Sequence, residues 1–135
     1  MDTMEARIRY LEAIQRIIDR LSTISSVIKG WSVTLTAALL VLASKDSNKG
    51  FFLVSYLPIL FFWLIDSEYL RMERQYKALY NQNADLKIPL CDFRIKRPKP
   101  NSENHTYFAQ CFFSRTELSV YLPQLLSILL VFILQ

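Results

Sequence analysis

The chain has 135 residues, of which 52% are hydrophobic and only two are glycine, and its formal net charge is +4. Two isolated glycines exclude a glycine-rich phosphate-binding loop. Because the apolar residues gather in long runs, little is left for a large soluble core, and we expect one small unit built from long helices.

Residues 1–28 are predicted to form an amphipathic helix that continues into the next segment, with a bend near Gly30. Two interpretations stay open: the helix packs on a neighbouring helix, or it lies in an anionic membrane surface. The mixture of arginines with acidic residues off the apolar stripe favours packing. The stripe recurs at spacings of three and four residues: Met4, Ile8, Leu11, Ile14, Ile18, Leu21 and Ile28.

Residues 29–66 are predicted to form a transmembrane helical hairpin. Two apolar runs without charged side chains, 31–43 and 51–65, are separated by the polar turn 44–50. Each run reaches membrane-spanning length when a flanking turn is added. Trp31 and Trp63 lie at the ends that share one side, as is typical of aromatic residues at the headgroup level. A buried helical pair in a soluble domain is the alternative, but residues 61–65 are apolar around the whole helix.

Polar residues inside the hairpin are the first candidate site. Ser32 and Thr36 lie one helical turn apart, with Lys29 one turn below on about the same face. Their hydroxyl groups either bond to backbone carbonyls or to another helix, or line a water-filled path formed by several copies. Spacing alone favours the packing contact. Asp66 lies level with Lys29, and the two residues either form an ion pair or both face headgroups.

Residues 67–82 are predicted to continue the second helix as a cytosolic stalk. An apolar stripe extends along it at helical spacing and offers the N-terminal helix a partner. The stripe consists of Ile65, Tyr69, Met72, Tyr76 and Leu79.

Residues 83–114 are predicted to be a basic cytosolic segment, punctuated by three prolines, in which a short strand or an extended loop stays open. Its cations suit the phosphates of lipid headgroups, of a nucleotide or of an oligonucleotide. The alternative is a simple positive-inside loop, which the sequence favours. The candidate ligand-binding residues are Arg94, Lys96, Arg97 and Lys99, together with Arg71 and Arg74 of the stalk.

Residues 115–135 are predicted to form a third, C-terminal transmembrane helix. Ser114 followed by Glu117 matches a capping box. Five Lys or Arg residues precede Trp31, nine lie between Asp66 and Glu117, and two lie in the hairpin turn. By the positive-inside rule, the N-terminus is cytosolic and the C-terminus lies outside. The fold class is therefore an all-α membrane protein.

Residues that could carry catalysis are sparse. His105 is the only histidine and lies in a polar loop, while Cys91 and Cys111 are expected to be reduced cytosolic thiols that form no zinc site. Most carboxylates are interspersed with Lys and Arg, as on solvated helix faces. We expect no enzyme activity, no catalytic residue, no metal site and no cofactor.

The order of these features resembles a group of small bacterial membrane proteins. The resemblance is carried by residues 29–35, 43–47, 56–63, 69–74, 113–117 and 121–123. In plan the chain is similar to the two-transmembrane SMODS/SLOG-associating-like effectors paired with nucleotidyltransferases in antiphage defence, and to the channel-like effector of the Hailong system. The third apolar run departs from a strict two-helix plan.

This resemblance implies an oligomeric pore or channel effector in the bacterial inner membrane, as a tetramer or a larger assembly. It implies gating by a nucleotide or short DNA oligonucleotide made by a nucleotidyltransferase encoded nearby, with loss of membrane integrity or potential as the outcome. Ser32, Thr36 and Lys29 would then line the pore. The alternative is a non-conducting membrane anchor that recruits a cytosolic partner through the stalk stripe and the N-terminal helix.

Overall fold

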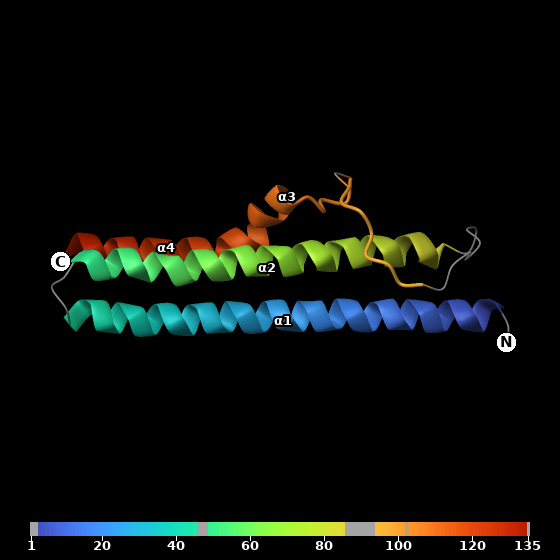
Figure 1. Cartoon of the computed structure of the whole chain (residues 1–135), viewed down its shortest axis with the longest axis horizontal. Helices are drawn as coiled ribbons and strands as arrows, with labels where there is room; N and C mark the ends of the chain where they lie inside the picture. Colours follow the sequence, from blue (N-terminus) through green and yellow to red (C-terminus); the bar gives the residue numbers. More distant parts are fainter. Residues whose placement is uncertain (1–2, 46–48, 86–93, 102, 135) are drawn as a thin grey trace.

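A computed structural model describes residues 3–45, 49–85, 94–101 and 103–134, and these form four helices: α1 (Thr3–Lys45), α2 (Lys49–Ala84), α3 (Phe108–Phe112) and α4 (Arg115–Leu134). Figure 1 shows α1 beside α2 over nearly their whole lengths, with α4 along the first half of α2. The predicted all-α fold is confirmed. Residues 94–101 contain no strand, so the segment there is extended loop.

Helices α1 and α2 are each longer than one membrane crossing. With 43 and 36 residues, they extend over ~65 and ~54 Å at about 1.5 Å per residue. A hydrocarbon core is about 30 Å thick. The N-terminal helix and the first crossing are therefore one continuous helix, and so are the second crossing and the stalk, which runs to Ala84.

The N-terminal part of α1 packs on the C-terminal part of α2 through an apolar cluster. Tyr10, Ile14 and Ile18 of α1 are buried against partly buried side chains of α2 and the loop: Tyr76, Leu79, Tyr80 and Ile95. This confirms helix packing as the role of residues 1–28.

The predicted stripe on the first turns of α1 is wrong in one respect. Met4 and Ile8 are 48% and 50% exposed, whereas Arg7 and Tyr10 are buried. The physical reason is that the face directed at α2 begins at Arg7, whose Nη1 donates a hydrogen bond to the backbone oxygen of Asp85 at 2.7 Å. A long side chain with a polar end can bury its stem and still reach this carbonyl.

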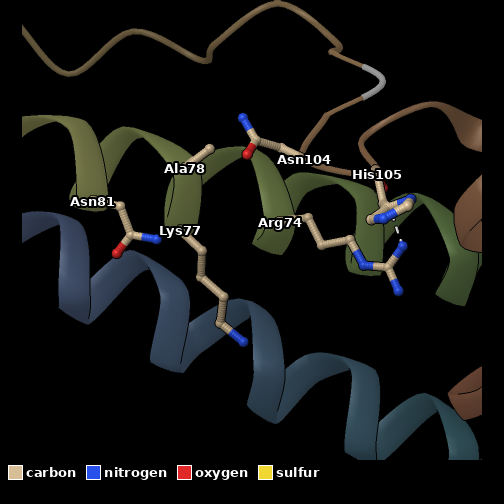
Figure 2. Close-up of a pocket in the computed structure, with 6 residues that line it drawn as sticks. All are labelled: Arg74, Lys77, Ala78, Asn81, Asn104 and His105. Carbon is tan, nitrogen blue, oxygen red and sulfur yellow. Dashed lines mark hydrogen bonds between the residues drawn. The ribbon is translucent and has the colours of Figure 1, made fainter.

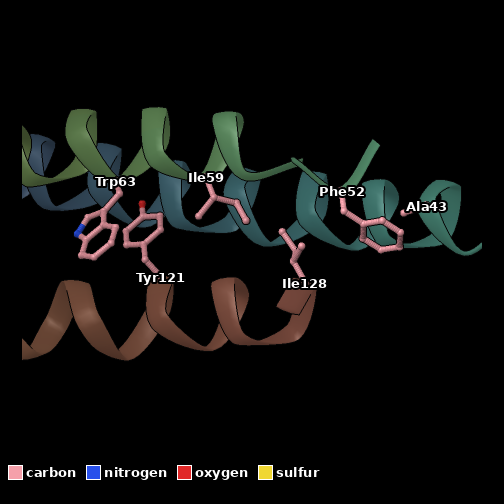
Figure 3. Packing of buried hydrophobic residues seen from close by; sticks show 6 residues of the cluster. All are labelled: Ala43, Phe52, Ile59, Trp63, Tyr121 and Ile128. Carbon is pink, nitrogen blue, oxygen red and sulfur yellow. The ribbon is translucent and has the colours of Figure 1, made fainter. Parts of the chain in front are cut away.

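The other half of the molecule is a bundle of α1, α2 and α4. Its apolar cluster lies mainly between α2 and α4 (Figure 3) and consists of Ala43, Phe52, Ile59, Trp63, Tyr121 and Ile128. Large apolar side chains such as Leu53, Phe61 and Leu130 remain exposed around the outside. Among the described residues, three helices are long and apolar enough to cross a membrane. In Figure 1 the C-terminus lies beside the start of α2, and the N-terminus lies at the opposite end of the molecule.

Trp63 is buried inside the bundle, whereas Trp31 lies on its outer surface. Their exposed fractions are 7% and 67%. The short helix α3 covers Trp63: the rings of Trp63 and Phe112 stack at 4.2 Å, and Trp63 Nε1 donates to the backbone oxygen of Phe112 at 3.1 Å. A buried indole N–H needs such an acceptor.

Candidate functional site: a polar network inside the three-helix bundle

Polar side chains on three helices converge inside the apolar bundle. Helix α1 contributes Ser25, Lys29, Ser32 and Thr36, spaced four, three and four residues apart, so all lie on one face. Helix α4 contributes Glu117, Tyr121 and Gln124 at spacings of four and three, and α2 contributes Asp66. Seven of these eight residues are buried, each with at most 7% of its surface exposed, and the exception is Lys29.

The ammonium group of Lys29 joins all three helices. Its Nζ donates to Ser25 Oγ of its own helix at 2.8 Å, to Asp66 Oδ2 of α2 at 2.5 Å and to Glu117 Oε1 of α4 at 3.1 Å. An ammonium has three hydrogens, so each has an acceptor. The predicted ion pair of Lys29 with Asp66 is confirmed, and the interpretation in which both face headgroups is not.

Asp66 is fully buried and is the best-satisfied acceptor of the network. Besides Lys29, it accepts hydrogen bonds from Ser25 Oγ at 2.5 Å and from the Tyr121 hydroxyl at 2.9 Å. Three donors from α1 and α4 therefore surround one carboxylate of α2. Removing this carboxylate would leave an ammonium and two hydroxyl groups short of an acceptor.

Glu117 is equally buried but has fewer donors. Its Oε1 receives the 3.1 Å bond from Lys29, while Oε2 has no hydrogen-bond partner among the described residues. The predicted capping box is present only in half: Glu117 N donates to Ser114 Oγ at 3.4 Å, but the side chain turns inward to Lys29 instead of back to Ser114.

A layer of hydroxyl groups lies next along the bundle. Ser32 Oγ and Thr36 Oγ1 both contact Gln124 Oε1, at 2.8 and 2.9 Å, and Thr36 Oγ1 also reaches the backbone oxygen of Ser32 at 2.8 Å. Both hydroxyls thus bond to another helix of the same chain, as the packing interpretation expects. Within one chain Ser32, Thr36 and Lys29 face the bundle interior, and their role in a pore stays a prediction. Thr34 lies on the exposed face, as predicted.

Several of the predicted ligand-binding cations have partners on α2. Arg97 pairs with Glu68 at 2.6 Å and donates to Gln75 at 2.7 Å, and Arg71 pairs with the same Glu68 at 3.2 Å. These contacts hold the loop on α2. Arg94, Lys96 and Lys99 have exposed side chains on the same loop. The basic segment therefore serves partly as a strap between loop and stalk.

A polar hollow lies where the loop after residue 102 meets the stalk (Figure 2). It measures about 310 Å³ and is lined by Arg74, Lys77, Ala78, Asn81, Asn104 and His105. Arg74 Nη1 donates to the backbone oxygen of His105 at 3.0 Å, and Lys77 pairs with Glu73 on its own helix. Of the predicted ligand-binding residues, only Arg74 reaches this hollow.

Cys111 lies under the same loop and is buried. Its Sγ contacts the backbone oxygen of His105 at 3.4 Å and Arg74 Nη1 at 3.7 Å. Burial raises the pKa of this thiol above its usual value, and the nearby Arg74 opposes the rise only partly. A protonated, buried thiol is unreactive. Cys91 lies outside the described residues.

Four members of the network were not predicted as site residues: Ser25, Glu117, Tyr121 and Gln124. Their signal in the sequence is polar groups at spacings of three and four within strongly apolar runs, the same signal that identified Ser32 and Thr36. Polar residues in membrane-spanning segments generally face a bundle interior. The spacing does not show which neighbouring helix each polar face contacts.

Comparison of the chain with protein-family models, with curated proteins and with solved structures finds no match. Within the described ranges, no group of three His, Cys, Asp or Glu side chains is arranged to hold a metal ion. The arrangement that remains to be explained is a hydrogen-bonded charge cluster joined to a hydroxyl layer inside helices suited to a membrane.

Proposed function

We propose that the chain is an oligomeric channel effector of the bacterial inner membrane that acts in antiphage defence and opens in response to a nucleotide or oligonucleotide signal. The observation that carries the ion-conducting part is the polar network from Lys29 through Gln124 inside three apolar helices. Ionisable residues in such helices are costly and mark ion or proton pathways more often than simple packing. The defence role and the ligand rest on the sequence resemblance alone.

In this proposal the described bundle is the closed state. Gln124 of α4 accepts hydrogen bonds from the hydroxyl groups of Ser32 and Thr36, and Lys29 contacts the carboxyl groups of Asp66 on α2 and Glu117 on α4. Opening moves α4 away from α1, so that water replaces Gln124 and the polar face of α1 becomes a lining. A ligand drives this change only by its higher affinity for the open arrangement.

The outer face of α1 is the proposed contact between copies. A hollow of about 410 Å³ there is lined by Val27, Gly30, Trp31 and Thr34, and a side chain added at Gly30 would meet nothing within 4 Å. Small residues let spanning helices approach closely. A neighbouring helix seated at Gly30 would bring several copies around one axis.

The ligand is proposed to bind at the junction of loop and stalk. The polar hollow lined by Arg74 and Lys77 lies on the loop that also carries exposed Lys99. The loop leads through α3 directly into α4, so that a ligand pulling on it acts on the helix that closes the bundle. Cationic and amide groups are suitable donors for phosphate oxygens.

The adaptor function has less support. Its two proposed docking faces were the stalk stripe and the N-terminal helix, and residues from these two faces pack on each other through Ile14, Ile18, Tyr76 and Leu79. A cytosolic partner would have to separate them first. The surfaces left open on this half are mainly polar.

Conductance of the purified chain in planar bilayers tests the proposal. The chain alone should pass little current, and Gln124→Leu, which removes the acceptor of Ser32 and Thr36, should raise the open fraction. Ser127→Leu is the matched control, because Ser127 lies one turn further along α4, is exposed and bonds only to its own helix. Absence of current from both variants and from the chain supplied with candidate nucleotides would contradict a channel.

A further inference from the structure

The charge cluster holds one cation and two carboxyl groups. Lys29 is shared between Asp66 and Glu117, and the fourth ionisable group in contact, Tyr121, donates its hydroxyl hydrogen to Asp66. If both carboxyl groups were ionised, the cluster would carry a net negative charge inside an apolar bundle. An unbalanced charge in such surroundings is costly, and protonation is the usual way in which it is removed.

The hydrogen bonds distinguish the two carboxyl groups. Asp66 accepts three hydrogen bonds, from Lys29, Ser25 and Tyr121, and this number of donors suits an ionised carboxylate, which only accepts. Glu117 accepts one hydrogen bond, at 3.1 Å, from the same ammonium that Asp66 binds. Glu117 Oε2 is buried without a partner among the described residues.

These two observations lead to one assignment. A carboxylate oxygen that lacks any donor in an apolar core is less stable than a protonated oxygen that lacks an acceptor, because only the first leaves a charge unsolvated. We propose that Glu117 is a proton-binding site: the folded bundle holds one proton on the Glu117 carboxyl group, beside the ionised pair of Lys29 and Asp66.

This inference goes beyond channel activity and applies whether or not the bundle conducts. The titratable groups near Glu117 are Lys29 from α1, Asp66 from α2, Cys111 from α3 and Tyr121 from its own helix α4. Loss of the proton would place a second negative charge beside Asp66 and would weaken the contact of α4 with α1 and α2. Proton release is therefore coupled to separation of α4 from the bundle.

Infrared spectroscopy of the full chain in lipid tests the assignment directly. At neutral pH the wild-type chain should show the carbonyl stretch of a protonated carboxylic acid, and Glu117→Gln should lack it. Glu12→Gln, which alters an exposed carboxylate of α1, should retain it. Absence of the band from the wild-type chain, or its persistence in Glu117→Gln, would overturn the proposal.

Thermal unfolding in detergent provides a second test that needs no activity. Because the folded bundle keeps a proton that the unfolded chain releases, the stability of the wild-type chain should fall as pH rises above about 4.3, where an unfolded glutamate ionises. Glu117→Gln mimics the protonated group, so its stability should fall much less over the same pH range and match the wild type at low pH. A variant that is equally destabilised at every pH would overturn the assignment and indicate an ionised Glu117 paired with Lys29.

Discussion

The two halves of this molecule are inverted with respect to each other. Around Lys29 and Asp66 the outside of the bundle is apolar and its interior holds a polar network beside the apolar cluster, whereas around Ile14 the exposed residues are mainly polar and α1 contacts α2 through an apolar cluster. The same two helices pass through both halves. The difference follows the solvent that each half is suited to, lipid for the first and water for the second.

This difference indicates which interactions stabilise each half. In water, burying the side chains of Ile14 and Ile18 is worth about 1.5–3 kcal/mol each. In lipid, apolar burial gives little advantage, and helices associate through packing and interhelical hydrogen bonds. We therefore expect the largest losses of stability from replacing polar residues in the bundle and from replacing apolar residues in the stalk half.

The largest expected effect is in the charge cluster. Asp66→Ala should destabilise the bundle by about 3–5 kcal/mol, because it leaves the partly buried Lys29 ammonium without the carboxylate of its ion pair. Glu12→Ala, which removes an exposed carboxylate from α1, should change stability by less than about 0.5 kcal/mol. Chemical unfolding in mixed micelles measures both. Equal effects of the two substitutions would remove the distinction between the halves.

The second largest loss of stability is expected in the stalk half. Ile14 is completely buried against α2, so Ile14→Ala should cost about 2–5 kcal/mol. Ile8 is half exposed on the same helix, and Ile8→Ala should be close to neutral. Amide hydrogen exchange should become faster only in the N-terminal turns of α1 and in the part of the stalk that faces them. Faster exchange around Ser32 as well would mean that the two halves unfold together.

A smaller effect is expected in the hydroxyl layer. Gln124→Leu removes the side-chain acceptor shared by Ser32 and Thr36, although Thr36 retains a backbone acceptor. Polar contacts between spanning helices average about 0.6 kcal/mol each, so the expected loss is about 1 kcal/mol. Unfolding in mixed micelles measures it, with Ser127→Leu as the control. A loss as large as that of Asp66→Ala would place the main polar contact in the hydroxyl layer.

The smallest effect is expected at the loop. Arg97→Ala removes a partly exposed ion pair with Glu68, which is worth about 0–1 kcal/mol. Global stability should barely change, but limited proteolysis within residues 94–101 should become faster because the strap on α2 is lost. Lys99→Ala, on the same exposed loop, is the control. No change in cleavage would show that other contacts fix this loop.

Much of the helical framework could be predicted from the sequence, because long apolar runs and regular spacing dictate local structure. The continuity of α1, the third spanning helix and the pairing of Lys29 with Asp66 all follow from residues within one hairpin or one run. Hairpin geometry fixes which residues are level with each other. Helix packing was also one of two interpretations of Ser32 and Thr36 from the sequence, because their spacing places both on one helix face.

The partner of each polar face could not be predicted. Glu117 matched a capping box because Ser114 lies three residues before it, yet its side chain is drawn to an ammonium 88 positions away. Similarly, the sequence made Arg97 a candidate for ligand binding but did not show that it pairs with Glu68 and donates to Gln75 of α2. Local pattern gives the face of a helix, whereas the neighbour of that face depends on the packing of distant segments.

A double-mutant cycle between Lys29 and Asp66 tests the central claim, that a buried charge cluster holds three spanning helices together. Lys29→Met, Asp66→Leu and the double variant would be unfolded in mixed micelles, and their free energies of unfolding compared with that of the wild type. We predict a coupling energy above about 2 kcal/mol, well beyond the ~0.6 kcal/mol average for polar pairs in membranes. A coupling energy near zero, with single variants as stable as the wild type, would contradict the claim.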